Sequence, residues 1–506
     1  MKAIIQYCIA LALTAGLLTG CDKFLDERPS KTSSLVVTTT DQLNALLNDY
    51  SQFYAESNST AILSTDDYGL TSTIYDARPG NFSPITVQYN TWDTAYLMDD
   101  PGQSFWSSEY RKIFTANMVL QYADKVTGSD EDKANLKADA YFIRAYSYFQ
   151  LANTFTLPYS GGKEEPGLPL KLTIAFDEPV ARAPLSKVYE QIESDLTKAM
   201  AVKVPLIQNG KPRHWRANTA AVNGFAARYY LAMNNYTDAL KYANLALQEY
   251  STLVDYNTQM RYGRDRVVTI NPGPNAQSVT LKYPYTHDNQ NDFTDMIGWP
   301  EFLYFRMLNY GTWWYMPSTG LLNLYDQAHD LRYLYHYVEG YSYDHGMANP
   351  AYNYPGYSFF FEDRIPSGPT TAEMWLIKAE AQARTGDFNG AMTTLNSLRA
   401  KRMTPGAWVN LTATGKDDAI KKVLEERRRE MPFVHRWYDV RRYNNNDDPN
   451  DDVVMSKTFY PYTLSSVLSS QPVKTYSMPV NSRRFAAPLP RTEMISSNGA
   501  IQQNTY

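Results

Sequence analysis

Apolar residues recur at helical spacing along much of the chain after residue 40. In segment 41–47, Leu43, Leu46 and Leu47 form one apolar stripe, and Asp41 is predicted to cap the helix by accepting from free backbone amides. The same period predicts helices over residues 105–126, 131–154, 186–201, 217–233, 236–250, 370–385, 388–402 and 416–430. Because no alternating strand pattern is as strong, we expect a mainly α fold.

Two long stretches, residues 60–104 and 251–369, show no sustained period. Both are rich in Gly, Pro, Asn, Asp and aromatic residues, which favour turns and irregular backbone. We therefore expect long, irregular, aromatic-rich loops with a few short strands.

Two helical segments share one frame of small and aromatic residues. Ala227, Tyr236 and Ala239 are spaced by nine and then three positions, and residues 379, 388 and 391 repeat that spacing with Ala, Phe and Ala. The frame resembles the tetratricopeptide helix pair, whose period is about 34 residues. For either segment alone a generic helical hairpin is an equal alternative. We expect these tetratricopeptide-like hairpins to form a scaffold that displays the loops.

The N-terminus carries an export pattern. Lys2 precedes an apolar run over residues 9–18 that is shorter than the ~20 residues of a membrane-spanning helix. The segment 18–21, Leu-Thr-Gly-Cys, resembles the lipobox of bacterial lipoproteins, which implies a signal peptide over residues 1–20 and lipid on the sulfur and amino group of Cys21. An ordinary signal peptide cut elsewhere is the alternative. Residues 21–40 are polar, include Pro29 and are expected to form a flexible tether.

Charge and cysteine content narrow the class of protein further. The chain has 48 basic and 53 acidic residues, so nothing points to a nucleic-acid partner. Its two cysteines are Cys8, inside the predicted signal peptide, and Cys21, so the mature chain cannot form an internal disulfide. Its stability must come from its core.

No sequence pattern points to catalysis, a metal or a cofactor. The six histidines lack the spacing of a zinc site, and no nucleophile elbow or phosphate-binding loop is present. Glu426 and Glu430, among interleaved arginines, could be read as a catalytic pair, but we expect a partly buried ion-pair network that ties the last helix to the scaffold. The acidic run 444–452 lacks the spacing of a calcium loop and is expected to be solvated. A glycosidase needs only two carboxylates brought together by the fold, so that alternative stays open.

Aromatic residues are the strongest hint of binding. The chain has 41 tyrosines, and most aromatic side chains are expected to pack in the core. A few in irregular backbone could stack on the C–H faces of sugars while polar neighbours bond the hydroxyls. On residue chemistry alone, the predicted ligand-binding residues are Asp67, Arg78, Trp92, Trp313, Trp314 and Tyr315.

Several segments, in order, resemble the SusD/RagB family of outer-membrane lipoproteins. Residues 105–117 resemble its Trp-x-x-x-Tyr-x-x-Ile-x-x-Ala-Asn helix, and residues 140–151 resemble the following Arg-Ala-Tyr helix. Further similarity lies in residues 184–196, 371–381 and 487–504. One departure is near His435, where Val434 alone stands in place of the usual Glu-Gly.

The resemblance implies a non-enzymatic lipoprotein, anchored in the outer membrane and exposed at the cell surface. It would comprise a single domain over residues 41–506, with an N-terminal part to about 250 and a C-terminal part from about 251. Such proteins capture a nutrient, usually a glycan, and act as a lid on a SusC-like TonB-dependent outer-membrane transporter. The alternatives are a peptide-binding RagB-like lipoprotein, a surface glycoside hydrolase and a structural subunit for transporter assembly.

Overall fold

Long helices dominate the computed structural model, which describes residues 37–97, 104–159, 164–175, 177–178, 180–288, 296–309, 314–361 and 363–506. The eight longest are α8 Phe105–Tyr122, α9 Asp130–Phe155, α10 Leu185–Ala199, α11 Thr219–Ala232, α12 Tyr236–Glu249, α16 Thr371–Arg384, α17 Phe388–Arg399 and α18 Lys416–Glu430. Each starts within two residues of its predicted position, and the mainly α prediction is confirmed. The predicted signal peptide, Cys21 and residues 22–36 of the tether lie outside the described residues.

The first described helix, α3 Thr40–Leu47, corrects one prediction. Its N-cap is Thr39, not Asp41, because the Thr39 hydroxyl accepts from the amide of Gln42 at 3.3 Å while the Gln42 side chain accepts from the Thr39 amide at 3.3 Å. Asp41 instead lies in the first turn, where a negative charge favours the helix dipole. Leu43 and Leu47 are buried, as predicted.

Short elements fill the segments between the long helices. The short helices are α4 Tyr50–Phe53, α5 Ser59–Leu63, α6 Ser72–Ala77, α7 Pro84–Thr91, α14 Thr319–Leu322, α15 Leu331–His336, α19 Arg436–Tyr443 and α20 Arg491–Ser496. The strands are β1 Ala55–Glu56, β2 Ile207–Gln208, β3 Lys211–Pro212, β4 Tyr262–Ile270, β5 Gln277–Pro284, β6 Met307–Asn309, β7 Tyr337–Val338, β8 Gly356–Tyr357, β9 Arg364–Pro366, β10 Met455–Phe459 and β11 Lys474–Met478.

The two predicted hairpins are present and have matching turns. Helices α11 and α12 are joined through Asn234, and α16 and α17 through Gly386, each with a positive φ (57° and 99°). A left-handed residue just past a helix end satisfies its last carbonyls and reverses the chain, which suits Gly and Asn. The next residue caps the second helix in both: Asn235 accepts from Asp238 and Asp387 accepts from Gly390.

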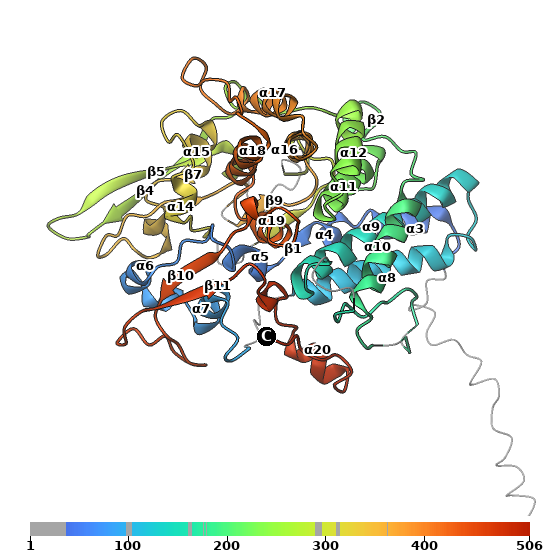
Figure 1. Ribbon diagram of the computed structural model, residues 1–506, viewed down its shortest axis with the longest axis horizontal. Helices are drawn as coiled ribbons and strands as arrows, with labels where there is room; N and C mark the ends of the chain where they lie inside the picture. Colours follow the sequence, from blue (N-terminus) through green and yellow to red (C-terminus); the bar gives the residue numbers. More distant parts are fainter. Residues whose placement is uncertain are drawn as a thin grey trace, which may run out of the picture.

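Helix α12 packs beside α16, although residues 250–370 separate the two hairpins in sequence (Figure 1). The small residues Ala239, Ala243 and Ala246 of α12 share one core cluster with Met374 and Ile377 of α16. Small side chains let helix axes approach closely, so the second hairpin continues the stack of the first. The helices α8 to α12 and α16 to α18 thus form the scaffold, with α8, α9 and α10 at one end.

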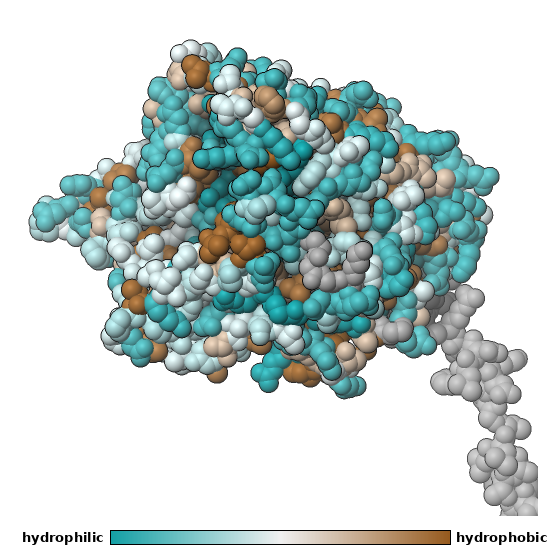
Figure 2. Space-filling model, viewed as in Figure 1, coloured by the Kyte–Doolittle hydropathy of each residue, from teal (hydrophilic) through white to brown (hydrophobic). Residues whose placement is uncertain are grey.

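The segment between the hairpins folds onto this scaffold and, with residues of segments 61–87 and 433–476, forms a separate aromatic core that we call the loop core. Its strand β6 pairs in parallel with β1, which connects the segment to the N-terminal part. On its other side β6 pairs antiparallel with β9 of the same segment. The hairpin β4–β5 is longer than the predicted short strands and projects from the body in Figure 1. Most residues of β4 are exposed on both faces, so its sequence has no apolar alternation. The face in Figure 2 is largely hydrophilic with small hydrophobic patches.

The predicted ion-pair network lies at the end of α18. Glu426 is fully buried and lies 2.7 Å from Arg332 and 2.9 Å from Arg399. Glu430, one turn later, binds Arg402 at 2.8 Å and Arg332 at 2.9 Å. These contacts join α18 to the loop core through Arg332 and to α17 through Arg399.

A second set of pairs joins α18 and the start of α19 to the N-terminal loop that contains Asp66 and Asp67. The Arg436 guanidinium forms a two-bond fork with Asp66, both contacts at 2.7 Å, and Arg428 binds Asp67 at 2.6 Å. Although burial opposes ionisation, Arg436 and Arg428 hold the pKa of Asp66 well below its usual range. Phe433, in the turn with the shortened sequence, has φ 65° and donates its amide to Asp67 at 2.8 Å.

Breaking the network at its centre should destabilise the protein strongly. We expect Glu426→Gln to lower the free energy of unfolding by about 3–5 kcal/mol, because it leaves buried guanidinium groups without their carboxylate. Denaturant unfolding measures the change. Glu190→Gln, which breaks the exposed pair with Lys187, is the matched control and should leave the unfolding midpoint unchanged. Equal midpoints for both variants would contradict the structural role of Glu426.

A buried carboxylate next to this network predicts acid sensitivity. Glu380 is fully buried, but Arg442 and Arg384 lower its pKa to about 2. The folded pKa of Glu380 lies below the unfolded value of 4.5. The contribution of its ionised form to the free energy of unfolding is therefore complete above about pH 4.5 and is lost as pH falls toward about 2. Between about pH 5 and about pH 3, the melting temperature of the wild type should fall more steeply than that of Glu380→Gln. Parallel slopes in thermal unfolding would refute this assignment.

Candidate functional site

The structure does not bring the six predicted ligand-binding residues together at one surface. Trp313 lies outside the described residues. Asp67, Trp92 and Tyr315 have buried side chains with partners inside the fold, Trp314 is 5% exposed, and Arg78 is exposed. Their roles in ligand binding remain predictions, and their surroundings divide them into two groups.

The buried group holds loops together. Both carboxylate oxygens of Asp67 are occupied, one by Arg428 and one by the amide of Phe433. The Tyr315 hydroxyl donates to the carbonyls of Leu308 at 3.2 Å and Asp363 at 2.9 Å. Each of these contacts fixes one stretch of irregular backbone against another.

Trp92 belongs to a different core from the loop aromatics. Its indole N–H donates to the carbonyl of Ser64 at 2.8 Å, and its ring packs in a small cluster with Trp437, Met455 and Phe485. It ends α7 with a positive φ of 55°. Trp92 therefore terminates the helix and packs beneath strands β10 and β11.

The second group, exposed Arg78 and buried Trp314, lies where the end of α6 meets the segment around residue 345. We call Arg78, Asn81, Trp314 and His345 the Arg78 surface. Asn81 donates its side-chain amide to the carbonyl of His345 at 2.7 Å, which ties the two segments together. The Arg78 guanidinium lies beside Gly346, where an added Cβ would come within 3.2 Å of Nε. The absence of a side chain at Gly346 thus makes room for Arg78.

An aromatic stack supports this surface from below. The rings of Trp314 and His345 are stacked, with their centroids 5.1 Å apart and an interplanar angle of 12°. The ring centroid of Phe82 lies 6.5 Å from that of Trp314, and the two rings are tilted. Burial, followed by the charge of Arg266, lowers the pKa of His345 to about 4. The imidazole is therefore neutral near pH 7 and packs as an uncharged ring.

The Arg78 surface offers hydrogen-bond donors next to apolar rings. Arg78 and Asn81 are exposed. The ring of Tyr460 packs against Tyr75, and its hydroxyl donates to Asp76 at 2.8 Å. A guanidinium and an amide can bind sugar hydroxyls or carbonyl oxygens, while ring edges meet C–H groups. Sequence reasoning missed Asn81 and His345, because 264 positions separate them and no motif links them.

A groove with aromatic residues on one wall lies between α8 and α20. This α8–α20 groove has a volume of about 390 Å³ and is lined by Trp106, Tyr110 and Phe114, one turn apart on α8, with Val180 and Glu493 opposite. Its size falls within the ~300–1,000 Å³ of small-molecule sites. Phe114 is 39% exposed, so an apolar surface is available there too.

Within the described ranges, no group of three or more His, Cys, Asp or Glu side chains is arranged to hold a metal ion. In the acidic run, Asp451 pairs with Arg384 and accepts from the Asn446 amide at 3.0 Å. None of the described helices has the length and apolar character needed to cross a bilayer.

Comparison with known proteins gives matches at both ends of the chain. The family model described as "Starch-binding associating with outer membrane" matches residues 23–231, and the model described as "SusD family" matches residues 371–506. A curated relative, SusD-like protein P2 of Formosa agariphila, is 29% identical over 154 residues. That alignment covers 29% of this chain and spans 28% of the relative's length.

Solved structures resemble the fold over nearly the whole chain. A SusD-like carbohydrate binding protein from Bacteroides vulgatus has a TM-score of 0.61 at 17% identity, covering 92% of this chain and 97% of its own. A laminarin binding SusD-like protein has a TM-score of 0.51 at 17% identity, covering 92% and 99%. At such identity these structures show the fold, and the two family models match in the order that the sequence motifs predict. The chain belongs to the SusD/RagB family.

Proposed function

We propose that this protein is a lipid-anchored glycan-binding protein of the cell surface. It captures an oligosaccharide or polysaccharide and delivers it to a SusC-like TonB-dependent outer-membrane transporter, without cleaving it. The family description names starch binding at the outer membrane, and two solved relatives are named for carbohydrate or laminarin binding. These names support a carbohydrate ligand and leave the individual sugar open.

The observation that carries the proposal is the Arg78 surface. It combines an exposed guanidinium and an exposed amide with a stacked Trp314–His345 pair at the boundary of the loop core. Glycan recognition needs this combination, because sugar rings have apolar faces and a rim of hydroxyls. The rigid aromatic core beneath Trp314 reduces the conformational entropy lost on binding.

Within this proposal the predicted residues take two kinds of role. Arg78 bonds the sugar hydroxyls, and Trp313, the chain neighbour of Trp314, supplies a stacking ring, while Trp314 supports it. Asp67, Trp92 and Tyr315 act indirectly, by fixing the loops on which the contacting residues lie.

Substitution at the Arg78 surface should separate binding from stability. In affinity gel electrophoresis against a polysaccharide panel, the wild type should be retarded by at least one glycan without releasing new reducing ends. Arg78→Ala and Asn81→Ala should each weaken retardation by about tenfold, the effect of a contact worth about 1.4 kcal/mol. Both side chains are exposed, so the free energy of unfolding should change by no more than about 0.5 kcal/mol.

Phe114→Ala, in the α8–α20 groove, is the matched control and should bind like the wild type. Loss of retardation in Phe114→Ala alone would move the site to that groove. Release of sugar products would favour the hydrolase alternative, and binding of peptides alone would favour a RagB-like role. Failure to bind any glycan or peptide would favour the assembly subunit.

Anchoring generates a separate prediction. Several acyl chains, at about 0.8 kcal/mol for each buried methylene, would hold the protein at the outer membrane. We expect Cys21→Ala to shift the protein from the membrane to the soluble fraction. Cys8→Ala, the other cysteine of the chain, should leave the protein in the membrane. Membrane retention of Cys21→Ala, measured by fractionation and immunoblot, would refute the lipid anchor.

A further inference from the structure

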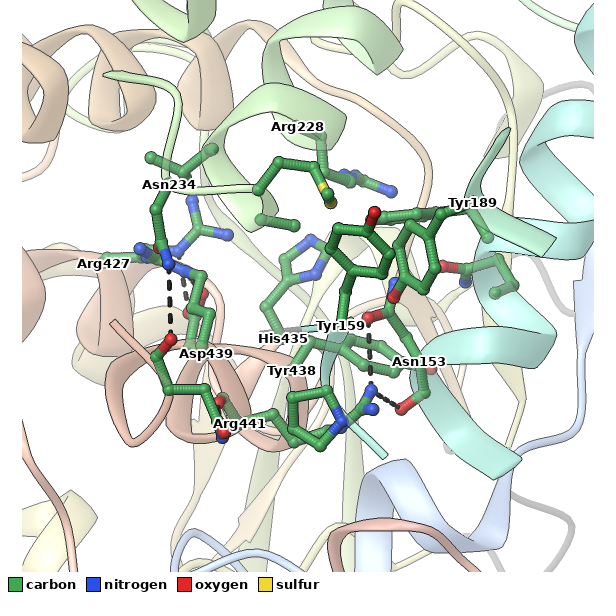
Figure 3. Close-up of a pocket in the computed structure, with 18 residues that line it drawn as sticks. Asn153, Tyr159, Tyr189, Arg228, Asn234, Arg427, His435, Tyr438, Asp439 and Arg441 are labelled. Atoms are coloured by element: carbon green, nitrogen blue, oxygen red, sulfur yellow. Dashed lines mark hydrogen bonds and ion pairs between the residues drawn. The ribbon is translucent and has the colours of Figure 1, made fainter. Parts of the chain in front are cut away.

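A cavity lined by arginines, other polar groups and apolar side chains such as Phe149 and Leu231 lies between the scaffold and the α19 segment, away from the Arg78 surface. Its volume is about 80 Å³, and Gln150 and Asn153 of α9, Tyr189 of α10 and Arg228 of α11 line one side. The other side consists mainly of Arg427 at the end of α18 and of residues at or near α19: His435, Tyr438, Asp439, Arg441 and Arg442 (Figure 3). We call it the arginine cavity. Its volume of about 80 Å³ exceeds the ~10–15 Å³ that a single bound water needs, so the cavity has room for a small molecule.

Three of the four arginines that line the cavity are neutralised by carboxylates. Arg228 forms a two-bond fork with Glu373, at 2.9 and 2.6 Å. Arg427 binds Asp439 at 2.7 Å. The third pair joins the guanidinium of Arg442 to Glu380, at 2.5 and 2.7 Å. Three cations therefore face three anions.

Arg441, the fourth arginine of the cavity, has no carboxylate partner among the described residues. It is 2% exposed, and its guanidinium donates only to neutral oxygens: the Asn153 carbonyl at 2.5 Å, the Asn153 side chain at 3.2 Å and the Thr156 carbonyl at 2.6 Å. Among the residues that the structure describes, no carboxylate lies within 4.0 Å of it. Burial lowers the pKa of Arg441 to about 10, because nothing nearby offsets its charge fully.

Unsatisfied donors accompany this unbalanced charge. Nε of Arg441 and Nη1 of Arg427 are both buried and have no hydrogen-bond partner within the described ranges. Both side chains line the cavity. A buried N–H without an acceptor and a buried charge without a counter-ion both destabilise the fold, and a bound anion would relieve both. The cavity thus has the charge, the donors and the space for a small anion.

We propose that the arginine cavity binds a small oxyanion, of the size of a sulfate ion or a carboxylate group, against the guanidinium of Arg441. Arginine binds such groups through directed, charge-assisted hydrogen bonds, and the cavity volume of about 80 Å³ has room for a group of this size. The oxyanion comes either as a free ion or as the charged substituent of a saccharide. The inference shares no residue with the Arg78 surface and does not rest on the proposed function.

Thermal unfolding with sodium sulfate replacing sodium chloride at constant ionic strength tests the proposal. The melting temperature of the wild type should rise and saturate, as expected for a ligand that binds only the folded state. Arg441→Gln should raise the half-saturating sulfate concentration by at least about tenfold. Arg483→Gln, which removes a surface arginine paired with Glu165, is the matched control and should respond like the wild type. Equal responses in all three proteins would overturn the proposal.

A second measurement does not depend on how the variant folds. In crystals of the wild type soaked in sodium selenate, an anomalous peak should lie within hydrogen-bond distance of Arg441. An empty cavity at saturating selenate would overturn the proposal. Competition then identifies the source: displacement of selenate by glucuronate but not by acetate assigns a charged saccharide, and displacement by acetate as well assigns a free ion.

Discussion

The buried pairing of arginines with carboxylates around α18 and α19 is the constraint on which the rest of the structure depends. Arg428 binds Asp67 across 361 positions of sequence, and Arg332, in the loop core, binds Glu426 at the end of the scaffold. A buried ion pair adds little net stability over apolar packing, but breaking one partner is costly, so the geometry is strongly specified. The network fixes the loops that carry Arg332 and Asp67 against the helical scaffold.

Much of the scaffold could be predicted from the sequence, because helical period and turn chemistry are local. Segment 416–430 is helical over the predicted residues, and the shared nine-and-three spacing correctly placed two hairpins whose turns use Asn234 and Gly386. The packing of α12 on α16 could not be predicted, since residues 250–370 separate them and the pattern of each helix shows only that it has an apolar face. The hairpin β4–β5 was missed because most of β4 is exposed on both faces, while the buried alternation of β5 is confined to Val279, Leu281 and Tyr283.

The candidate site was less accessible to prediction, because residue type does not reveal which rings are buried. Trp92 and Tyr315 look like ligand-stacking residues in sequence, yet their polar atoms bond backbone carbonyls inside the fold. Asn81 and His345 meet only in the folded chain. The same limit applies to Arg441 and its neighbour Arg442: the sequence presents two equivalent arginines, and only the tertiary structure gives one of them a carboxylate.

The protein has a helical scaffold, and buried ion pairs hold its loops in place. These loops present exposed polar side chains above packed aromatic rings. The chain belongs to a family described as starch-binding and associated with the outer membrane. The account centres on non-catalytic capture at the Arg78 surface. The most direct measurement is a crystal structure of the protein with an oligosaccharide that it retards on gels. The account predicts intact sugar rings in contact with Arg78 and Asn81. Density for the sugar in the α8–α20 groove, or for cleaved products anywhere, would contradict it.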